Sequence, residues 1–170
     1  MARPQFGVPH PSLIYRDRSA AFGVLERDGL IALVAVEKPG HAAWLDLPGG
    51  ALDPGEDAAA AMIREFGEEA GLAVAAGEML GEADQFFVNT DGEAFNNRQT
   101  LFETRLLAEV TELKIETDHT LVWLAPIDAV ARLRHDSHAW AVSLALRRRF
   151  RETLAQGNAP LTGLRVDEAQ

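Results

Sequence analysis

Residues 47–74 read LPGGALDPGEDAAAAMIREFGEEAGLAV, and this stretch joins a glycine pair to an alanine-rich segment that favours a helix. Asp57 is a residue type preferred at a helix N-cap, and Gly71 is one preferred just after a helix C-terminus. We therefore expect a helix between them. At about 100° per residue, its packing face consists of Ala59, Met62, Ile63, Phe66 and Ala70.

Glu65, Glu68 and Glu69 fall on the opposite side of this predicted helix, close to its C-terminal end. Carboxylates three and four residues apart repel one another, and the helix dipole disfavours negative charge at that end. A solvated helix face is the ordinary explanation for such a group of glutamates. The alternative is a bound cation, and Mg²⁺ prefers oxygen ligands of this kind.

Length and composition indicate one domain. The 170 residues are enough for a hydrophobic core, and we expect a single domain over 1–170 with an N-terminal arm at 1–18 and a loose tail at 157–170. The absence of cysteine excludes disulfides, thiolate metal sites and a cysteine nucleophile. Because there is neither a membrane-spanning apolar run nor a signal-peptide core, we expect a cytoplasmic protein.

The chain is acidic, with a formal net charge of −10 at pH 7. Nonspecific binding to DNA or RNA depends on neutralising phosphates with lysine and arginine, so a nucleic-acid polymer is an unfavourable partner. We expect no membrane partner either. A small anionic substrate is compatible with this charge when metal ions accompany it.

Apolar runs bounded by turn residues predict several strands around the helix. They cover residues 20–25, 30–36, 73–88, 99–110 and 119–124, with a short extended piece before Pro48. Asp28-Gly29 is a hairpin signal between the first two strands. Pro126 begins a short helix through Leu133, and a final helix opens with Asp136 or Ser137 as its cap. Since strands and helices do not alternate regularly, we predict an α+β fold with a mixed sheet flanked by helices.

The segment 50–72 resembles the Nudix box, whose pattern is Gly-x5-Glu-x7-Arg-Glu-U-x-Glu-Glu-x-Gly-U with U a bulky apolar residue. The matching positions are Gly50, Glu56, Arg64, Glu65, Phe66, Glu68, Glu69, Gly71 and Leu72. Phe66 replaces the usual aliphatic residue, and Gly67 costs about 1 kcal/mol in a helix relative to Ala. Neither departure removes a catalytic group. The similarity to bacterial MutT-like members extends over about 19–154.

The resemblance implies an α/β/α sandwich and a Mg²⁺-dependent hydrolase, with Mn²⁺ as a substitute ion. Nudix enzymes cleave a nucleoside diphosphate linked to another moiety, and a (deoxy)nucleoside triphosphate is one such substrate. The implied roles are metal ligation by Glu68, Glu69 and the Gly50 carbonyl, ligation or water activation by Glu65, support by Glu56, and orientation of the glutamates by Arg64.

Residues outside the box often complete sites in this family, and the sequence offers two sets of candidates. Glu116 and His119 precede a predicted strand and could add a metal ligand, although ordinary loop residues are the simpler interpretation. Trp44, Phe87 and Asn96 could stack on a base and hydrogen-bond to it or to a sugar, with core packing as the alternative for the aromatic rings.

Two histidines and four arginines in or next to the last predicted helix are expected to have structural roles. His135 and His138 are expected to cap or pack the last helix because no further ligands accompany them. Four arginines late in that helix, Arg147, Arg148, Arg149 and Arg151, suit the helix dipole and are expected to form a solvated face. A subunit contact is the alternative for this basic run.

Two rival functions share the same fold. A Nudix-fold binding or regulatory module would be expected to lack box carboxylates, and this chain keeps Glu56, Glu65, Glu68 and Glu69. An isoprenoid diphosphate isomerase of this fold would be expected to need an active-site cysteine, which the chain lacks. The sequence does not identify the diphosphate substrate, and a homodimer is the default oligomeric state.

Overall fold

The computed structural model describes residues 3–157. Its elements in chain order are β1 (Gln5–Phe6), β2 (Arg16–Arg27), β3 (Leu30–Val36), β4 (Trp44–Asp46), β5 (Gly49–Ala51), α1 (Ala58–Ala70), β6 (Leu72–Val88), β7 (Ala94–Glu109), a 3₁₀ turn (Thr111–Leu113), β8 (His119–Leu124), α2 (Pro126–Arg132) and α3 (Asp136–Ala155). Residues 158–170, nearly all of the predicted tail, lie outside the described residues. No helix within 3–157 is long and apolar enough to cross a membrane.

The strands form one mixed sheet in the order β1-β6-β7-β2-β3-β4, with β5 beside β2 and β8 beside β3. β2 runs parallel to β7, whereas the β2–β3 and β6–β7 pairs are antiparallel. This arrangement confirms the predicted mixed sheet. β7 begins at Ala94, earlier than the predicted residue 99, because the β6–β7 turn is tight: the Asn89 amide donates to the Glu93 carbonyl at 2.8 Å.

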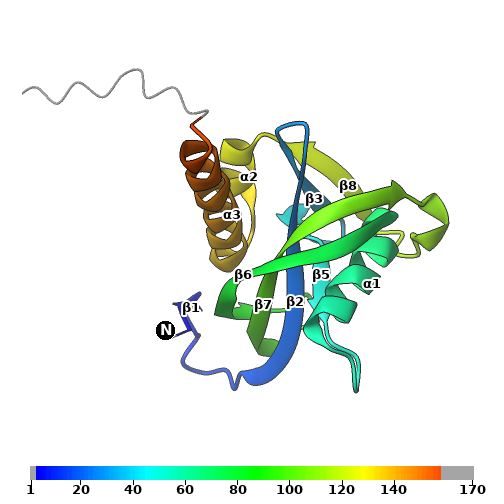
Figure 1. Cartoon of the computed structure of the whole chain (residues 1–170). Helices are drawn as coiled ribbons and strands as arrows, with labels where there is room; N and C mark the ends of the chain where they lie inside the picture. The colour runs from blue at the N-terminus through cyan, green and yellow to red at the C-terminus, as the bar shows by residue number, and fades with distance from the viewer. Residues whose placement is uncertain (1–2, 158–170) are drawn as a thin grey trace, which may run out of the picture.

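Helices cover both faces of the sheet, so the predicted α/β/α sandwich is confirmed (Figure 1). Alternation along β2 creates the two cores, because successive side chains of a strand point to opposite faces. Ala20, Phe22 and Val24 pack in the core beneath α2 and α3. Ala21 and Leu25 pack in the core beneath α1.

The ends of α1 are those that the sequence predicts. The Asp57 side chain accepts a hydrogen bond from the Ala60 amide at 2.8 Å. Gly71 adopts the left-handed conformation with φ 68°, and its amide donates to the carbonyls of Gly67 and Phe66. Both caps satisfy backbone groups that a helix terminus would otherwise leave without partners.

The predicted packing face of α1 is correct for Met62, Phe66 and Ala70, which are buried, but wrong for Ile63, which is 38% exposed. Glu69, expected on the opposite side, is only 7% exposed. The buried face of α1 is thus rotated from Ile63 toward Glu69. The spacing of apolar residues does not predict this rotation, because it takes no account of polar groups that can hydrogen-bond to a buried carboxylate. Here the surrounding structure supplies such groups to Glu69, as described below.

The predicted side-chain cap of α3 is absent. Its N-cap is His135, whose side chain makes no capping hydrogen bond, and Asp136 is already the first helical residue. The Ser137 amide instead donates a hydrogen bond to Gln85 Oε1 of β6, at 3.3 Å. A tertiary contact therefore replaces the local cap.

The basic run of α3 differs in part from the predicted solvated face. Arg147 and Arg151 are exposed, as predicted. Arg148 pairs with Glu152 at 3.1 Å and with Glu103 of β7 at 3.8 Å. Arg149 also approaches Glu103, at 3.9 Å. Two of the four arginines thus connect α3 to the sheet, because the Glu103 carboxylate of β7 lies within 4 Å of both guanidinium groups.

The predicted arm at 1–18 contains an edge strand. β1 pairs in parallel with β6, and Gln5 lies opposite Asp84. The Asp84 amide also donates to the Pro4 carbonyl at 2.8 Å. The last residues of this segment belong to β2, so the N-terminal part of the chain extends the sheet at its β6 edge.

Candidate active site

The glycine pair of β5 brings the backbone against α1. Gly49 has φ 139°, and a Cβ there would lie 2.2 Å from the Ala21 carbonyl oxygen. A Cβ at Gly50 would lie 2.6 Å from Glu65 Oε1. Only glycine permits both approaches, so the Glu65 carboxylate lies directly on the backbone of residue 50.

Arg64 joins three box glutamates. Its Nε and NH2 donate to the two carboxylate oxygens of Glu56, each at 3.0 Å. Its NH1 donates to Glu65 at 3.0 Å and to Glu68 at 2.9 Å. The hydrogen bonds to Glu56 and Glu65 raise the pKa of the guanidinium further above its usual value. The structure therefore shows the contacts that an orienting role for Arg64 requires, and this cation offsets the repulsion within the cluster.

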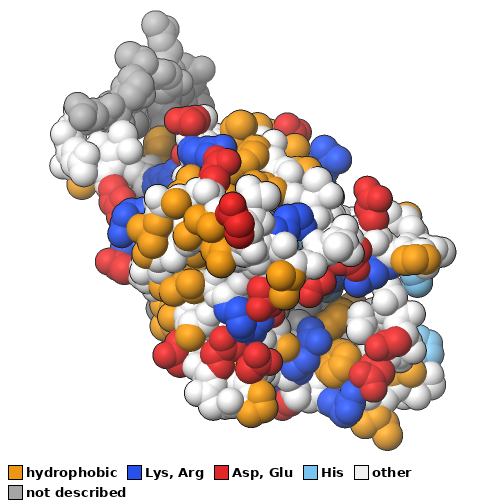
Figure 2. All heavy atoms as spheres, turned by 90° about the vertical axis from the view of Figure 1, so that its right-hand side faces the viewer, with side chains coloured by type: hydrophobic (Ala, Val, Ile, Leu, Met, Phe, Trp, Pro, Cys, Tyr) orange, Lys and Arg blue, Asp and Glu red, His pale blue; other side chains and the backbone are white. Residues whose placement is uncertain are grey.

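These glutamates lie on the face of the molecule that carries α1, where acidic and basic side chains are interspersed (Figure 2). Glu65, one of the three glutamates bound by Arg64, has a shifted pKa. Burial raises its pKa to about 7, and the charge of Glu69 adds to this effect while Arg64 opposes it.

Glu69 points away from Arg64 and toward the sheet. Its Oε2 accepts from the Gly49 amide at 3.0 Å, and its Oε1 lies 3.3 Å from His119 Nε2. The other ring nitrogen of His119 lies 2.8 Å from Asp118, which also pairs with Lys38. Burial raises the pKa of Glu69, whereas hydrogen bonds from Lys38 and His119 hold the pKa of Asp118 at about 2.

The loop before β8 is fastened to the C-terminal end of α1. The Glu116 amide donates to the Glu68 carbonyl at 3.0 Å. The Lys114 ammonium donates to the carbonyls of Glu69 at 3.0 Å and His119 at 2.6 Å, and also to that of Glu116. Three carbonyls thus surround one cation. Sequence analysis did not identify Lys114, because these contacts exist only after the loop packs on the helix.

Glu116 and His119, the two accessory candidates, occupy different environments. His119 is largely buried and contacts Glu69, so it belongs to the site. The Glu116 side chain is 44% exposed, with its carboxylate 4.0 Å from His119 Nδ1. Within residues 3–157, the residues whose potential metal-ligand atoms all lie within 4.8 Å of one another are Glu116, Asp118 and His119.

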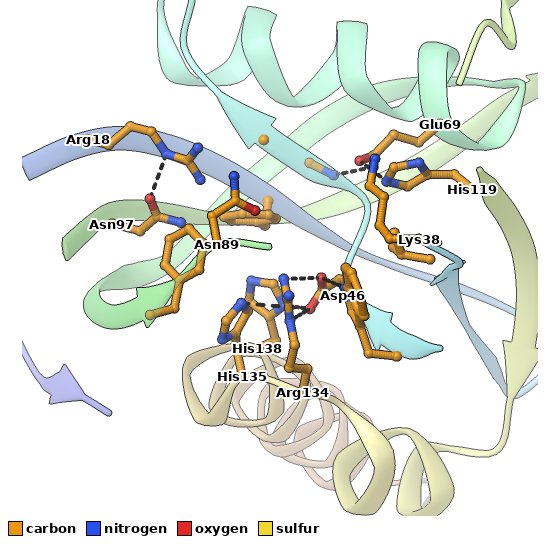
Figure 3. A pocket seen from close by; sticks show the side chains of 16 residues that line it. Arg18, Lys38, Asp46, Glu69, Asn89, Asn97, His119, Arg134, His135 and His138 are labelled. Carbon is orange, nitrogen blue, oxygen red and sulfur yellow. Dashed lines mark hydrogen bonds and ion pairs between the residues drawn. The ribbon is translucent and has the colours of Figure 1, made fainter. Parts of the chain in front are cut away.

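Beside Gly50 and Glu69 lies a pocket of about 170 Å³. Its walls come from β2, β4, the end of the β6–β7 hairpin and the start of α3 (Figure 3). Gly50, Glu69 and His119 are at one end, and Asp46, Arg134 and His138 are at the other. A small molecule in this pocket would therefore contact the box at one end.

The inner end of the pocket contains a buried carboxylate. Asp46 Oδ2 accepts from Arg134 NH2 at 2.6 Å and from the Trp44 indole at 2.9 Å. Burial raises the pKa of Asp46, and Arg134 opposes this shift. Burial also lowers the pKa of His135, to about 3, and that of His138. Sequence analysis did not identify Asp46 or Arg134 as lining residues.

The histidines of α3 pack as predicted and also line the pocket. The His138 ring lies 4.4 Å from the Phe22 ring, and its Nδ1 accepts from the Leu47 amide at 3.3 Å. His135 makes an edge contact with Phe87, with ring centroids 5.4 Å apart. Both rings are therefore fixed parts of the pocket wall.

Of the residues predicted to bind substrate, Trp44 and Phe87 line the pocket and Asn96 does not. The Asn96 amide points to the opposite face of β7, where it contacts Gln5 at 3.1 Å. Its neighbour Asn97 lines the pocket instead. Successive side chains of a strand point to opposite faces, so the structure places Asn97, and not the predicted Asn96, at the pocket.

Comparison with known proteins places this fold and site in one family. The sequence profile of the NUDIX domain matches residues 15–152. The RNA pyrophosphohydrolase of Sphingopyxis alaskensis is 29% identical over 122 residues, which cover 66% of this chain and 76% of that protein.

Solved structures show the same fold. A MutT NUDIX hydrolase from Burkholderia pseudomallei aligns with a TM-score of 0.56 and 26% identity over 76% of this chain and 98% of that one. A NUDIX hydrolase from Nitrosomonas europaea aligns with a TM-score of 0.61 and 20% identity over 91% of this chain and 100% of that one. The profile match spans every strand of the sheet except β1, together with the box helix and the pocket, and the chain belongs to the NUDIX hydrolase family.

Proposed function

We propose that this chain is a Mg²⁺-dependent pyrophosphohydrolase that cleaves the diphosphate bond of a small nucleotide-like substrate, with a (deoxy)nucleoside triphosphate as the leading candidate. The main support is that a pocket with aromatic side chains reaches the box at Gly50 and Glu69, and that Gly50 lies against Glu65, one of the glutamates joined by Arg64. Nudix hydrolases generally use divalent metals and act on nucleotide-like diphosphates.

The donor atoms of the site fit a hard divalent cation. They are carboxylate and backbone carbonyl oxygens, which suit Mg²⁺ and Mn²⁺. Glu68, Glu69, Glu65 and the Gly50 carbonyl would hold the ion, and the cluster of Glu116, Asp118 and His119 offers further ligands. A bound divalent ion would neutralise phosphate charge and acidify an attacking water.

The chain's own residues then have distinct tasks. Arg64 holds Glu56, Glu65 and Glu68 in place. Glu65 is proposed as a metal ligand or, because burial raises its pKa to about 7, as the base that accepts the proton of the attacking water. A positioned base contributes roughly 10²- to 10⁴-fold to turnover. Trp44 and Phe87 are proposed to contact the base of the substrate, since both line the pocket.

The test is a substrate panel assayed for phosphate-containing products with Mg²⁺ and with a chelator. It includes nucleoside triphosphates, dinucleoside polyphosphates, nucleotide sugars, ADP-ribose, NADH and an RNA oligonucleotide with a 5′-triphosphate. We expect Mg²⁺-dependent cleavage of a small nucleotide, because a net charge of −10 disfavours the polymer. Cleavage that persists with chelator would overturn the metal proposal. Nucleotide binding without any cleavage would favour a regulatory module.

Trp44→Ala should raise KM by about 5- to 100-fold with little change in kcat, because base–aromatic stacking contributes roughly 1–3 kcal/mol. Trp44→Phe is the matched control, since it keeps a ring in the pocket and should retain a near-normal KM. Steady-state kinetics and a thermal melt distinguish the roles. A lower Tm with unchanged KM in the alanine variant would assign Trp44 to packing alone.

Lys114→Met should lower turnover by about 10- to 100-fold and raise the Mg²⁺ concentration needed for half-maximal rate, because outer groups that orient metal ligands have effects of this size. Methionine keeps the aliphatic stem but removes the ammonium bound to the Glu69 and His119 carbonyls. Arg132→Met on the exposed face of α2 is the control. A reduced Tm with an unchanged Mg²⁺ dependence would show a purely structural role.

A further inference from the structure

Arg18 projects from β2 into the pocket. It shares the pocket-facing side of β2 with Phe22, which lies at the pocket base. Figure 3 shows its guanidinium pointing into the pocket from the β2 side, with Arg134 entering from the opposite side. The charges of both Glu65 and Arg134 act on the Arg18 guanidinium, and they shift its pKa in opposite directions.

The contacts of Arg18 leave most of its donors available. Its Nε donates to Asn97 Oδ1 at 2.9 Å. The guanidinium carbon lies 4.6 Å from the Phe95 ring centroid and 5.2 Å from that of Phe87. Within the described part of the chain, no carboxylate oxygen lies within 4.0 Å of its nitrogen atoms. Its NH1 and NH2 groups thus have no hydrogen-bond acceptor among these residues.

This lack of a carboxylate distinguishes Arg18 from the other cations of the pocket. Arg134 is paired with Asp46 at 2.6 Å, and Lys38 is paired with Asp118. Arg18 is half-buried, and burial lowers its pKa. Stacking on aromatic rings recovers only part of the hydration that a cation loses on burial. An anionic ligand that accepts from the two terminal nitrogens would compensate further.

We propose that Arg18 binds the phosphate that remains on the nucleoside after cleavage, through hydrogen bonds from NH1 and NH2. The identity of the anion as a nucleoside phosphate rests on the proposed function. The position of Arg18 favours this phosphate, because Arg18 lines the same pocket as Trp44 and Phe87, which are proposed to contact the base, and as Gly50, against which the Glu65 carboxylate lies. Arg64 cannot replace it, since all three of its nitrogens are already bonded to glutamates.

The experiment compares calorimetric binding of nucleoside 5′-monophosphates with that of the corresponding nucleosides. Adenine, guanine, cytosine and uracil compounds are titrated with chelator present, so neither metal binding nor hydrolysis affects the result. Arg18→Gln should weaken monophosphate binding about 10- to 100-fold and leave nucleoside binding unchanged, since a charge-assisted hydrogen bond contributes roughly 1.5–3 kcal/mol.

Arg16→Gln is the matched control. Arg16 lies on the same face of the same strand, but it is 61% exposed and pairs with Glu93 at 2.8 Å. The Arg16→Gln variant should bind nucleoside monophosphates as tightly as the wild-type protein does. Equal weakening for nucleoside and monophosphate, no change in Arg18→Gln, or no monophosphate binding by the wild-type protein would each overturn the proposal.

Failure of this inference is distinguishable from failure of the proposed function. Cleavage of a panel substrate, together with wild-type monophosphate binding by Arg18→Gln, would reject the role of Arg18 alone. Phosphate-selective loss of binding in Arg18→Gln, without cleavage of any panel substrate, would support Arg18 and reject the hydrolase.

Discussion

Glu69→Gln should leave the protein folded and lower kcat by roughly 10²- to 10⁴-fold, because several kcal/mol of metal-dependent charge stabilisation would be lost. Glutamine keeps the side-chain volume and an oxygen that can accept from the Gly49 amide. The change removes the negative charge and one proposed ligand atom. The measurement is kcat for the best panel substrate at saturating Mg²⁺, together with Tm.

Glu112→Gln is the control for this experiment. Glu112 is an exposed residue of the 3₁₀ turn next to the site. Its substitution by glutamine removes the same charge without changing the pocket. Its kcat should equal that of the wild-type protein. A near-normal kcat in Glu69→Gln would show that Glu69 is not a metal ligand. Unfolding of that variant would indicate a structural role, and Glu68→Gln would then be the variant to assay.

Arg64→Met should reduce both stability and activity. Without the guanidinium, Glu56, Glu65 and Glu68 would repel one another with no cation between them. Because the four side chains are 15–28% exposed, solvent screens part of this effect, and we expect a loss of about 1–3 kcal/mol in the free energy of unfolding. Turnover should fall by at least about 100-fold, since positioning of ligand groups is lost.

Added Mg²⁺ provides a sharper readout for Arg64→Met. A divalent cation bound by the glutamates would replace part of the missing positive charge, so Mg²⁺ should raise the Tm of this variant more than that of the wild-type protein. Arg105→Met, which removes an exposed arginine of β7, should show neither effect. A Tm that does not respond to Mg²⁺ would argue against a cation site at these glutamates.

The sequence predicts α1 well because its signals are local. Asp57 and Gly71 act through hydrogen bonds within a few residues, and both caps occur as expected. The Nudix pattern also anticipates the contact of Arg64 with Glu68, because residues four apart are neighbours on the surface of one helix. Local spacing is therefore sufficient for the helix and for the Arg64–Glu68 contact, whereas the contact with Glu56 also depends on the turn that precedes α1.

Features that depend on tertiary packing escaped prediction. Asn96 and Asn97 are neighbours in β7, and the pairing of this strand with β2 and β6 determines which of the two side chains faces the pocket. The burial of Glu69 depends on His119, a residue of a distant strand. No sequence spacing connects Glu69 with His119, so only folding brings these two residues together.

Mn²⁺ binding, followed by electron paramagnetic resonance of the free ion, shows whether the box glutamates hold a divalent cation. The wild-type protein is predicted to bind Mn²⁺, and Glu68→Gln and Glu69→Gln are predicted to weaken this binding at least about tenfold, with Glu112→Gln unchanged. Mn²⁺ binding of equal strength in all four proteins, or none in the wild-type protein, would contradict a metal site built from Glu68 and Glu69.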